Sequence, residues 1–305
     1  MHPANAIKIL RTNDLDRACA RHLQRRQRAH ELVRVRHGVY VERAPWEALD
    51  GRSRHLVRMR AVIPLLRTDA VFALDSAAAV LGLPRLDPWP DRVQAVDAGI
   101  EHDQHRVSLT VHAGVPERSG KLFHGVPFTS LAQTTVENAR RGTLADAVVG
   151  LDHALRSGVG RGELEHMCAA GGPWGAVRVE QALAICDARH ESVGESYLAV
   201  RAAELHCPDW EPQHEFRSPD GRVDRVDFWL PRQGIVVEFD GRQKYEDPGM
   251  LGGRTGAEAV WSEKQREDRV RGQSEVNGFV RVYWEHVVAP ERLRSLFRQH
   301  GVPCR

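Results

Sequence analysis

An alternating stretch, RVDFWLPRQGIVVEFDGRQKY at residues 225–245, constrains the fold more than any other feature of the chain. Apolar side chains occupy every second position on both sides of the PRQG segment, which predicts two β-strands joined by a turn. With a four-residue loop, Leu230 pairs with Ile235. The sequence therefore predicts an antiparallel hairpin with one register.

Three carboxylates gather on this predicted hairpin. Counting back from the turn sets Asp227 opposite Glu238, and the two-residue period of a strand puts Asp240 on the same face. Like charges directly across a sheet repel one another, so the arrangement is unfavourable without a counter-ion. Oxygen ligands of this kind suit a hard divalent cation. The sequence thus predicts a metal site on the hairpin.

Composition places the chain among globular proteins of several domains. It has 305 residues, of which 42% are hydrophobic and 28% are charged. We find no apolar run long enough to cross a membrane and no secretory signal, so no membrane contact is expected. The five cysteines lack CxxC spacing, which suits a reducing cytoplasm. Helical and strand patterns are both present, and we expect an α/β (α+β), multi-domain fold; the oligomeric state stays open.

Positive charge is concentrated near the N-terminus. Residues 1–60 contain fourteen Lys and Arg against six Asp and Glu, a local net charge of +8, whereas the whole chain has +2. Such an excess is typical of a nucleic-acid-binding module. A solvated, Arg-rich surface explains the same numbers, and composition alone does not separate the two interpretations.

The segment 1–50 is predicted to be a winged helix-turn-helix. Helical patterns run through DLDRACARHL and through residues 24–31, and LVRVRHGVYVER then alternates around a His-Gly turn. This segment resembles the N-terminal domain of AbiEi-family antitoxins, in which a helical pair precedes a similar wing. Arg34 and Arg36 face outward in the predicted wing, where they would contact DNA phosphates. The resemblance also implies a cognate toxin protein as a partner.

The middle region, residues 51–190, is predicted to be an α/β scaffold that ends in helices. The stretch GVPFTSLAQTTVENARRGTLADAVVGLDHALRSG resembles a segment of AbiEi-like proteins. That family has an Arg-Thr pair followed by Asp, where this chain has Gln133, Thr134 and Asn138. We assign no catalytic group to this region.

Residues 191–305 are predicted to form a helix, three strands, a helix and a last strand, with the acidic hairpin in the centre. This order, together with DF and VVEFDG, resembles the PD-(D/E)xK nuclease core and most closely the very-short-patch-repair-like endonucleases. The fold that this resemblance implies is a restriction-endonuclease-like mixed sheet flanked by helices.

The resemblance assigns roles to individual residues. Asp227 and Glu238 match the two acidic metal ligands of the family, and Asp240 stands where the family's lysine is expected. Glu195, on the preceding helix, matches a further metal or water ligand, although an acid near a helix N-terminus is also common for stability. The missing ammonium would have to come from Lys244 or Lys264.

Two arginines of the following helix, Arg266 and Arg269, are candidates for nucleic-acid contact, and ordinary helix-surface charge is the alternative. The site chemistry favours Mg²⁺ or Mn²⁺, which would activate water and polarise a phosphodiester. We expect a DNA endonuclease acting in defence, toxin–antitoxin systems or repair. The alternative is an AbiEi-like DNA-binding regulator with an inactive nuclease-fold domain, and a third interpretation is a nuclease for RNA.

Overall fold

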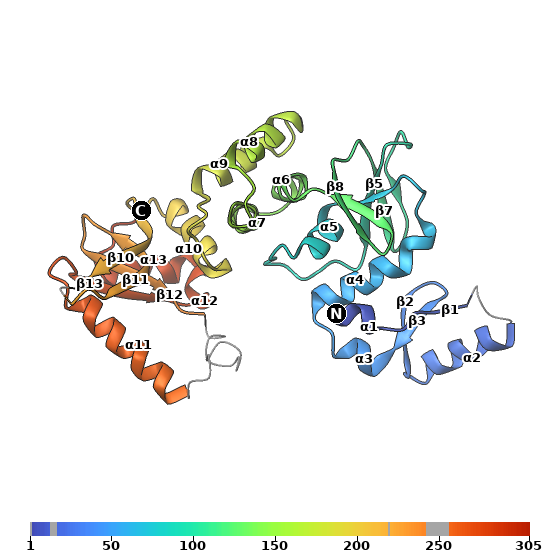
Figure 1. Cartoon of the computed structure of the whole chain (residues 1–305), viewed down its shortest axis with the longest axis horizontal. Helices are drawn as coiled ribbons and strands as arrows, with labels where there is room; N and C mark the ends of the chain where they lie inside the picture. The colour runs from blue at the N-terminus through green and yellow to red at the C-terminus, as the bar shows by residue number, and fades with distance from the viewer. Residues whose placement is uncertain (1, 13–16, 219, 242–255) are drawn as a thin grey trace. The chain divides into compact units, whose positions relative to one another are not determined.

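The computed structural model describes residues 2–12, 17–218, 220–241 and 256–305. It confirms the α+β, multi-domain class: helices accompany three separate sheets. The chain divides into two compact units, Met1–Gly150 with Gly158–Val179, and Leu151–Ser157 with Glu180–Arg305 (Figure 1). No helix in the described part of the chain combines the length and apolar character needed to cross a lipid bilayer.

The first unit begins with a small three-stranded sheet of order β1-β3-β2. Its elements are α1 (Pro3–Ala6), β1 (Leu10–Arg11), α2 (Arg17–Arg28), β2 (Leu32–Arg36), β3 (Val39–Glu42) and α3 (Arg43–Glu47). The predicted hairpin wing is present as β2 and β3. The prediction of two separate helices, one through DLDRACARHL and one through residues 24–31, is wrong, because α2 is one continuous helix from Arg17 to Arg28. It ends where His30 takes a φ of 61° and the N–H of Glu31 donates to the Arg26 carbonyl.

A six-stranded sheet of order β6-β7-β5-β4-β9-β8 follows in the first unit. It comprises β4 (Val71–Phe72), β5 (Val93–Asp97), β6 (Gln104–His105), β7 (Leu109–Ala113), β8 (Arg118–Phe123) and β9 (Val126–Thr129). Helices accompany it as α4 (Gly51–Val62), the 3₁₀ turn Ile63–Leu65, α5 (Leu74–Leu81) and α6 (Leu131–Arg141). Val41 of β3 shares one hydrophobic core with Phe72 and Phe128, so the wing and the larger sheet pack together.

Three further helices follow α6: α7 (Leu144–Arg156), α8 (Arg161–Ala170) and α9 (Ala176–Ile185). Both α7 and α9 contribute residues to each of the two units. Arg140 is buried at the end of α6 and donates to the carbonyl of Cys168, in the last turn of α8, and to that of Gly172, just after this helix. These hydrogen bonds satisfy a buried guanidinium and fix the turn between α8 and α9.

The second unit has the predicted order of helix, three strands, helix and strand. Its elements are α10 (Val193–Glu204), β10 (Glu211–Arg217), β11 (Val223–Leu230), β12 (Ile235–Phe239), α11 (Gly256–Arg271), β13 (Gly278–Val282), α12 (Trp284–Val287) and α13 (Pro290–Gln299). The sheet order is β10-β11-β12-β13, antiparallel except that β12 and β13 are parallel and joined by α11. The last strand was predicted too long, because the chain after Tyr283 turns into α12.

Helices cover both faces of this sheet (Figure 1). Leu198 of α10, Val287 of α12 and Phe297 of α13 pack against one face, and Val270 of α11 packs against the other. The predicted strict alternation of β11 is wrong at Val226, which belongs to the α11-side cluster whereas Phe228 and Leu230 belong to the opposite one. The neighbouring strand is irregular at the same level: Gln213 of β10 has a φ of 55°.

Candidate active site

The hairpin register brings two of the predicted carboxylates to neighbouring strands. Leu230 pairs with Ile235 and Phe228 with Val237, as the sequence predicted. Asp227 and Glu238 lie one step beyond the last of these pairs. Asp227 accepts a hydrogen bond through Oδ2 from the Phe239 N–H at 2.8 Å. This contact fixes the Asp227 carboxylate against the end of β12.

Glu238 is buried and ion-paired. It is 8% exposed, and its Oε1 lies 2.7 Å from Nη2 of Arg266, a residue of α11. Burial raises the pKa of Glu238, and the Arg266 guanidinium opposes that rise by stabilising the carboxylate. An isolated buried carboxylate is costly, so the partner from α11 is what lets the charged form persist here.

Arg266 connects three elements. Its Nη2 also lies 2.5 Å from Oε1 of Glu263, and its Nη1 donates to the carbonyl of Arg225 in β11 at 2.8 Å. Burial lowers the pKa of Arg266, but the hydrogen bonds and charges of Glu263 and Glu238 raise it by more. Arg266 therefore links α11 to the two central strands of the sheet.

A second arginine stands beside this group. Arg281 of β13 pairs in register with Glu238, and its Nη2 lies 2.5 Å from Oε2 of Glu267 and 3.9 Å from Oε1 of Glu263. Arg271 of α11 also pairs with Glu267 at 2.7 Å, so three glutamates share three arginines on this side of the sheet. The charges of these ion pairs therefore balance one another.

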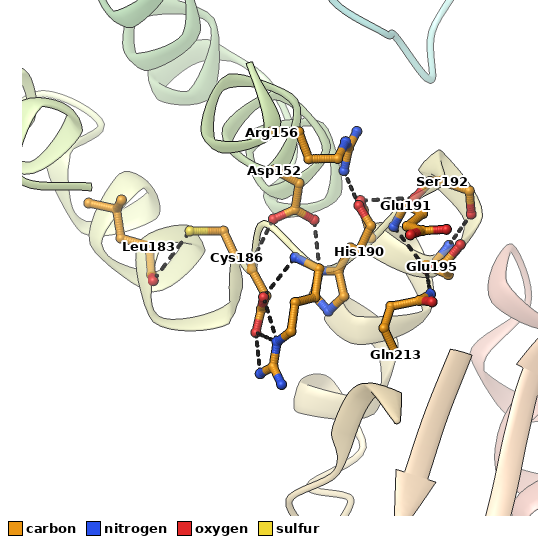
Figure 2. A network of polar contacts seen from close by, with 12 residues as sticks. Asp152, Arg156, Leu183, Cys186, His190, Glu191, Ser192, Glu195 and Gln213 are labelled. Carbon is orange, nitrogen blue, oxygen red and sulfur yellow. Dashed lines mark hydrogen bonds and ion pairs between the residues drawn. The ribbon is translucent and has the colours of Figure 1, made fainter. Parts of the chain in front are cut away.

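The carboxylate of Glu195 accepts two hydrogen bonds at the start of α10. Ser192 caps that helix by accepting from the Glu195 N–H, and Glu195 Oε2 accepts from the Glu191 N–H at 2.9 Å and from the Gln213 amide at 2.8 Å (Figure 2). These contacts join the helix start to β10. In the structure the Glu195 carboxylate stabilises this junction, and its role as a metal or water ligand stays a prediction.

A buried histidine holds the loop that leads into α10. The Nδ1 of His190 lies 2.8 Å from Oδ2 of Asp152, and both residues are almost fully buried (Figure 2). The other oxygen of Asp152 accepts from the Asp187 N–H, and Arg156 donates to the His190 carbonyl. The network fixes the segment just before Glu195. The sequence did not reveal it, because Asp152 and His190 lie 38 residues apart.

The remaining site candidates occupy different environments. Asp240 is half-buried, and its N–H donates to the Val282 carbonyl, which extends the β12–β13 pairing by one residue. Lys264 is exposed on α11. Lys244 lies outside the described residues.

Arg269 is also paired with the sheet. Its Nε and Nη2 lie 2.8 Å and 2.6 Å from the two oxygens of Asp224, a bidentate ion pair. Hydrogen bonding from Arg269 lowers the pKa of Asp224. Asp224 was not singled out from the sequence, although it stands three residues before Asp227 on the same strand and is 5% exposed.

The two wing arginines differ. Arg34 is exposed, as predicted. Arg36 donates through Nε to the Ala61 carbonyl at 2.8 Å and through Nη1 to the His37 carbonyl, and the strand pairing shifts between Arg34 and Arg36. The shift gives the two side chains different surroundings. Helix α2 adds three exposed arginines that the local charge count included but did not single out, Arg21, Arg25 and Arg28.

The donor set decides which metal the site would accept. Asp227, Glu238 and Asp240 offer only carboxylate oxygens, which suit Mg²⁺ or Mn²⁺ rather than zinc. Within residues 2–12, 17–218, 220–241 and 256–305, no three His, Cys, Asp or Glu side chains converge as a metal-binding group. The ligand chemistry fits a hard divalent cation, and the arrangement requires Glu238 to exchange Arg266 for that cation.

Comparison with known proteins shows the family but no named activity. No family model matches the chain. The uncharacterized protein Rv2248 of Mycobacterium tuberculosis strain H37Rv is 30% identical over 226 residues, which cover 72% of this chain and 78% of the relative. MT2308 of strain CDC 1551 / Oshkosh, also uncharacterized, gives the same values. The chain belongs to the family of these mycobacterial proteins.

A solved structure is also similar in part. The crystal structure of the RV2827C protein from Mycobacterium tuberculosis has 17% sequence identity, and the match covers 70% of this chain and 84% of that one. Its TM-score of 0.36 is too low to establish a shared fold.

Proposed function

We propose that this chain is a metal-dependent endonuclease that hydrolyses phosphodiester bonds in DNA. The observation that carries the proposal is the position of Asp227 and Glu238 at the same level of two neighbouring strands, in a sheet of order β10-β11-β12-β13 with α11 as its crossover. This is the arrangement in which the resemblance to PD-(D/E)xK nucleases expects two acidic metal ligands.

Each residue of the site has a separate task in this proposal. Asp227 and Glu238 would hold Mg²⁺ or Mn²⁺, with Asp240 at the end of β12 as a further oxygen ligand. The cation would lower the pKa of a bound water and polarise the phosphodiester. The exposed arginines of α2 and the wing would bind the DNA backbone and hold the nuclease unit on its substrate.

Plasmid cleavage tests the proposal. The full-length protein is incubated with supercoiled DNA and Mg²⁺ or Mn²⁺, beside Asp227→Asn and Glu238→Gln. We expect nicked or linear product from the wild type and a rate lower by about 10² or more in both variants, because each removes a charged ligand of the cation that polarises the reacting phosphate. Glu215→Gln is the matched control, since Glu215 is an exposed carboxylate of the same sheet that pairs with Arg217.

Wild-type protein that leaves DNA intact with every metal, or equal cleavage by the site variants, would contradict the proposal. A parallel incubation with single-stranded RNA separates the substrate classes. Cleavage of RNA alone would retain the phosphodiester chemistry and overturn the choice of DNA.

A DNA-binding regulator with an inactive nuclease-fold unit is the second candidate. The observation that favours it is the Arg266–Glu238 ion pair, because Arg266 neutralises a carboxylate that would bind a metal ion in an active site. A regulator would bind duplex DNA without a divalent cation and leave it uncut. Its Asp227→Asn variant would bind with the same affinity as the wild type in a gel-shift titration, and neither would cleave in Mn²⁺.

A further inference from the structure

In the resemblance to PD-(D/E)xK nucleases, Asp240 stands at the position of the lysine that normally supplies positive charge. Lys264 lies two residues before Arg266, and residues two apart on a helix do not share a face. Lys264 is exposed, whereas Arg266 points to Glu238. Among the residues that the structure describes, Arg266 is the cation in direct contact with the proposed metal ligand Glu238.

The bonds that Arg266 makes allow an exchange of partners. It holds Glu238 through Nη2 alone, while Glu263 receives bonds from both Nε and Nη2 of the same guanidinium. Without its bond to Glu238, Arg266 would stay anchored through Nε to Glu263 and through Nη1 to the Arg225 carbonyl, and Nη2 would be released from Glu238. The Arg266 side chain is 24% exposed, so its guanidinium has a route to solvent and to a ligand there.

The charged form of Glu238 needs a positive partner. It is 8% exposed, and a charged carboxylate at that depth is stabilised by either a guanidinium or a metal ion. A cation that binds Oε1 of Glu238 would compete with Arg266 for the same atom. The released guanidinium would then lie beside the cation, where a planar group with several N–H donors suits a phosphate.

We propose that Arg266 carries the positive charge of the cleavage site: it holds Glu238 while no divalent cation is bound, and it turns to the scissile phosphate when a cation takes Glu238. This inference rests on the proposed endonuclease function. It assigns Arg266 two separable effects. Arg266 weakens cation binding by competition, and it accelerates cleavage by stabilising charge on the phosphate.

Calorimetric titration with Mn²⁺, in the absence of nucleic acid, measures the first effect. We expect Arg266→Gln to bind Mn²⁺ about tenfold more tightly than the wild type, because the competitor for Glu238 is gone. The second effect is measured by plasmid cleavage at saturating Mn²⁺. There Arg266→Gln should be slower than the wild type by about 10² or more, in spite of its tighter binding of the cation.

Arg271→Gln is the matched control. Arg271 lies on the same helix and is ion-paired with Glu267 rather than with Glu238, so its Mn²⁺ affinity should equal that of the wild type. The double variant Arg266→Gln with Glu238→Gln should bind Mn²⁺ more weakly than Arg266→Gln alone. If circular dichroism shows that Arg266→Gln does not fold, Arg266→Met, which also removes the charge, replaces it, and tighter Mn²⁺ binding is expected again.

Unchanged or weaker Mn²⁺ affinity in the folded Arg266 variant would overturn the inference, and so would an absence of Mn²⁺ binding in both proteins. Tighter binding with undiminished cleavage would overturn the role at the phosphate. The outcome for the proposed function is separate: wild-type protein that never cleaves DNA defeats the endonuclease proposal even when Arg266→Gln binds Mn²⁺ more tightly.

Discussion

Gly194 in the first turn of α10 lies directly against the aromatic ring of Phe239 in β12. A Cβ added to Gly194 would overlap three carbons of that ring. The close approach lets α10 pack onto the hairpin, so that Glu195 reaches Gln213 of β10. The absence of one methyl group therefore sets the distance between this helix and the strand that carries Glu238.

Gly194→Ala should destabilise the second unit. The added methyl forces α10 or Phe239 to move, and overpacking of this kind costs about 1–3 kcal/mol. Urea unfolding followed by tryptophan fluorescence measures the change. Gly278→Ala is the control, because a Cβ there meets Ile235 at an ordinary contact distance of 3.4 Å. Equal stability of the two variants would show that the Gly194 contact is not limiting.

Glu195→Ala should destabilise the junction between α10 and β10. The substitution leaves the Glu191 N–H and the Gln213 amide without their acceptor, a loss of about 1–3 kcal/mol for buried groups. Glu195→Gln keeps an acceptor oxygen of the same reach and should lose much less. Thermal unfolding of both variants checks the difference, and an equal loss in both would argue that the negative charge, not the hydrogen bonds, matters.

His55 should make the first unit sensitive to acid. Burial lowers its pKa to about 4, and its ring nitrogens contact the Pro90 carbonyl and the Ser76 hydroxyl. Because the folded pKa lies below the ordinary value of 6.5, the unfolded chain binds the proton first and stability falls as pH drops from 6.5 to 4. The free energy of unfolding falls by roughly 3 kcal/mol through the protonation of His55 alone.

Unfolding measured at pH 7, 5.5 and 4 tests the role of His55. The variant His55→Gln should lose this part of the pH dependence, even if it is less stable than the wild type at pH 7. Parallel pH profiles for the two proteins would assign the acid sensitivity to other groups.

Arg34→Ala should weaken binding to duplex DNA and reduce its salt dependence. Removing one ion pair with a phosphate makes the slope of log K against log salt shallower by about 0.9. Arg36→Ala should instead act on stability, since its guanidinium is bonded to the Ala61 carbonyl. Fluorescence anisotropy at several salt concentrations, with thermal unfolding of both variants, separates the two effects. An unchanged salt slope in Arg34→Ala would exclude the wing as a DNA contact.

Local patterns in the sequence determined the elements and the hairpin of the second unit. Alternation and the PRQG turn predicted the pairing of Leu230 with Ile235, because the two-residue period of a strand and the length of a turn fix register locally. The Ser192 cap marked the start of α10 for the same kind of reason. The acidic hairpin was therefore identifiable before any tertiary contact was known.

Only the tertiary structure decided the partners of those carboxylates. Glu238 contacts Arg266, which lies 28 residues later in the chain, because the crossover helix α11 packs against the sheet. Glu195 of α10 contacts Gln213 of β10 because Gly194 lets α10 pack closely on Phe239. The irregularity at Gln213 and Val226 likewise depends on two strands at once. The spacing of residues in the sequence predicts the hydrogen bonds within one helix or hairpin. The charge balance of a buried site depends instead on which faces of distant elements pack together.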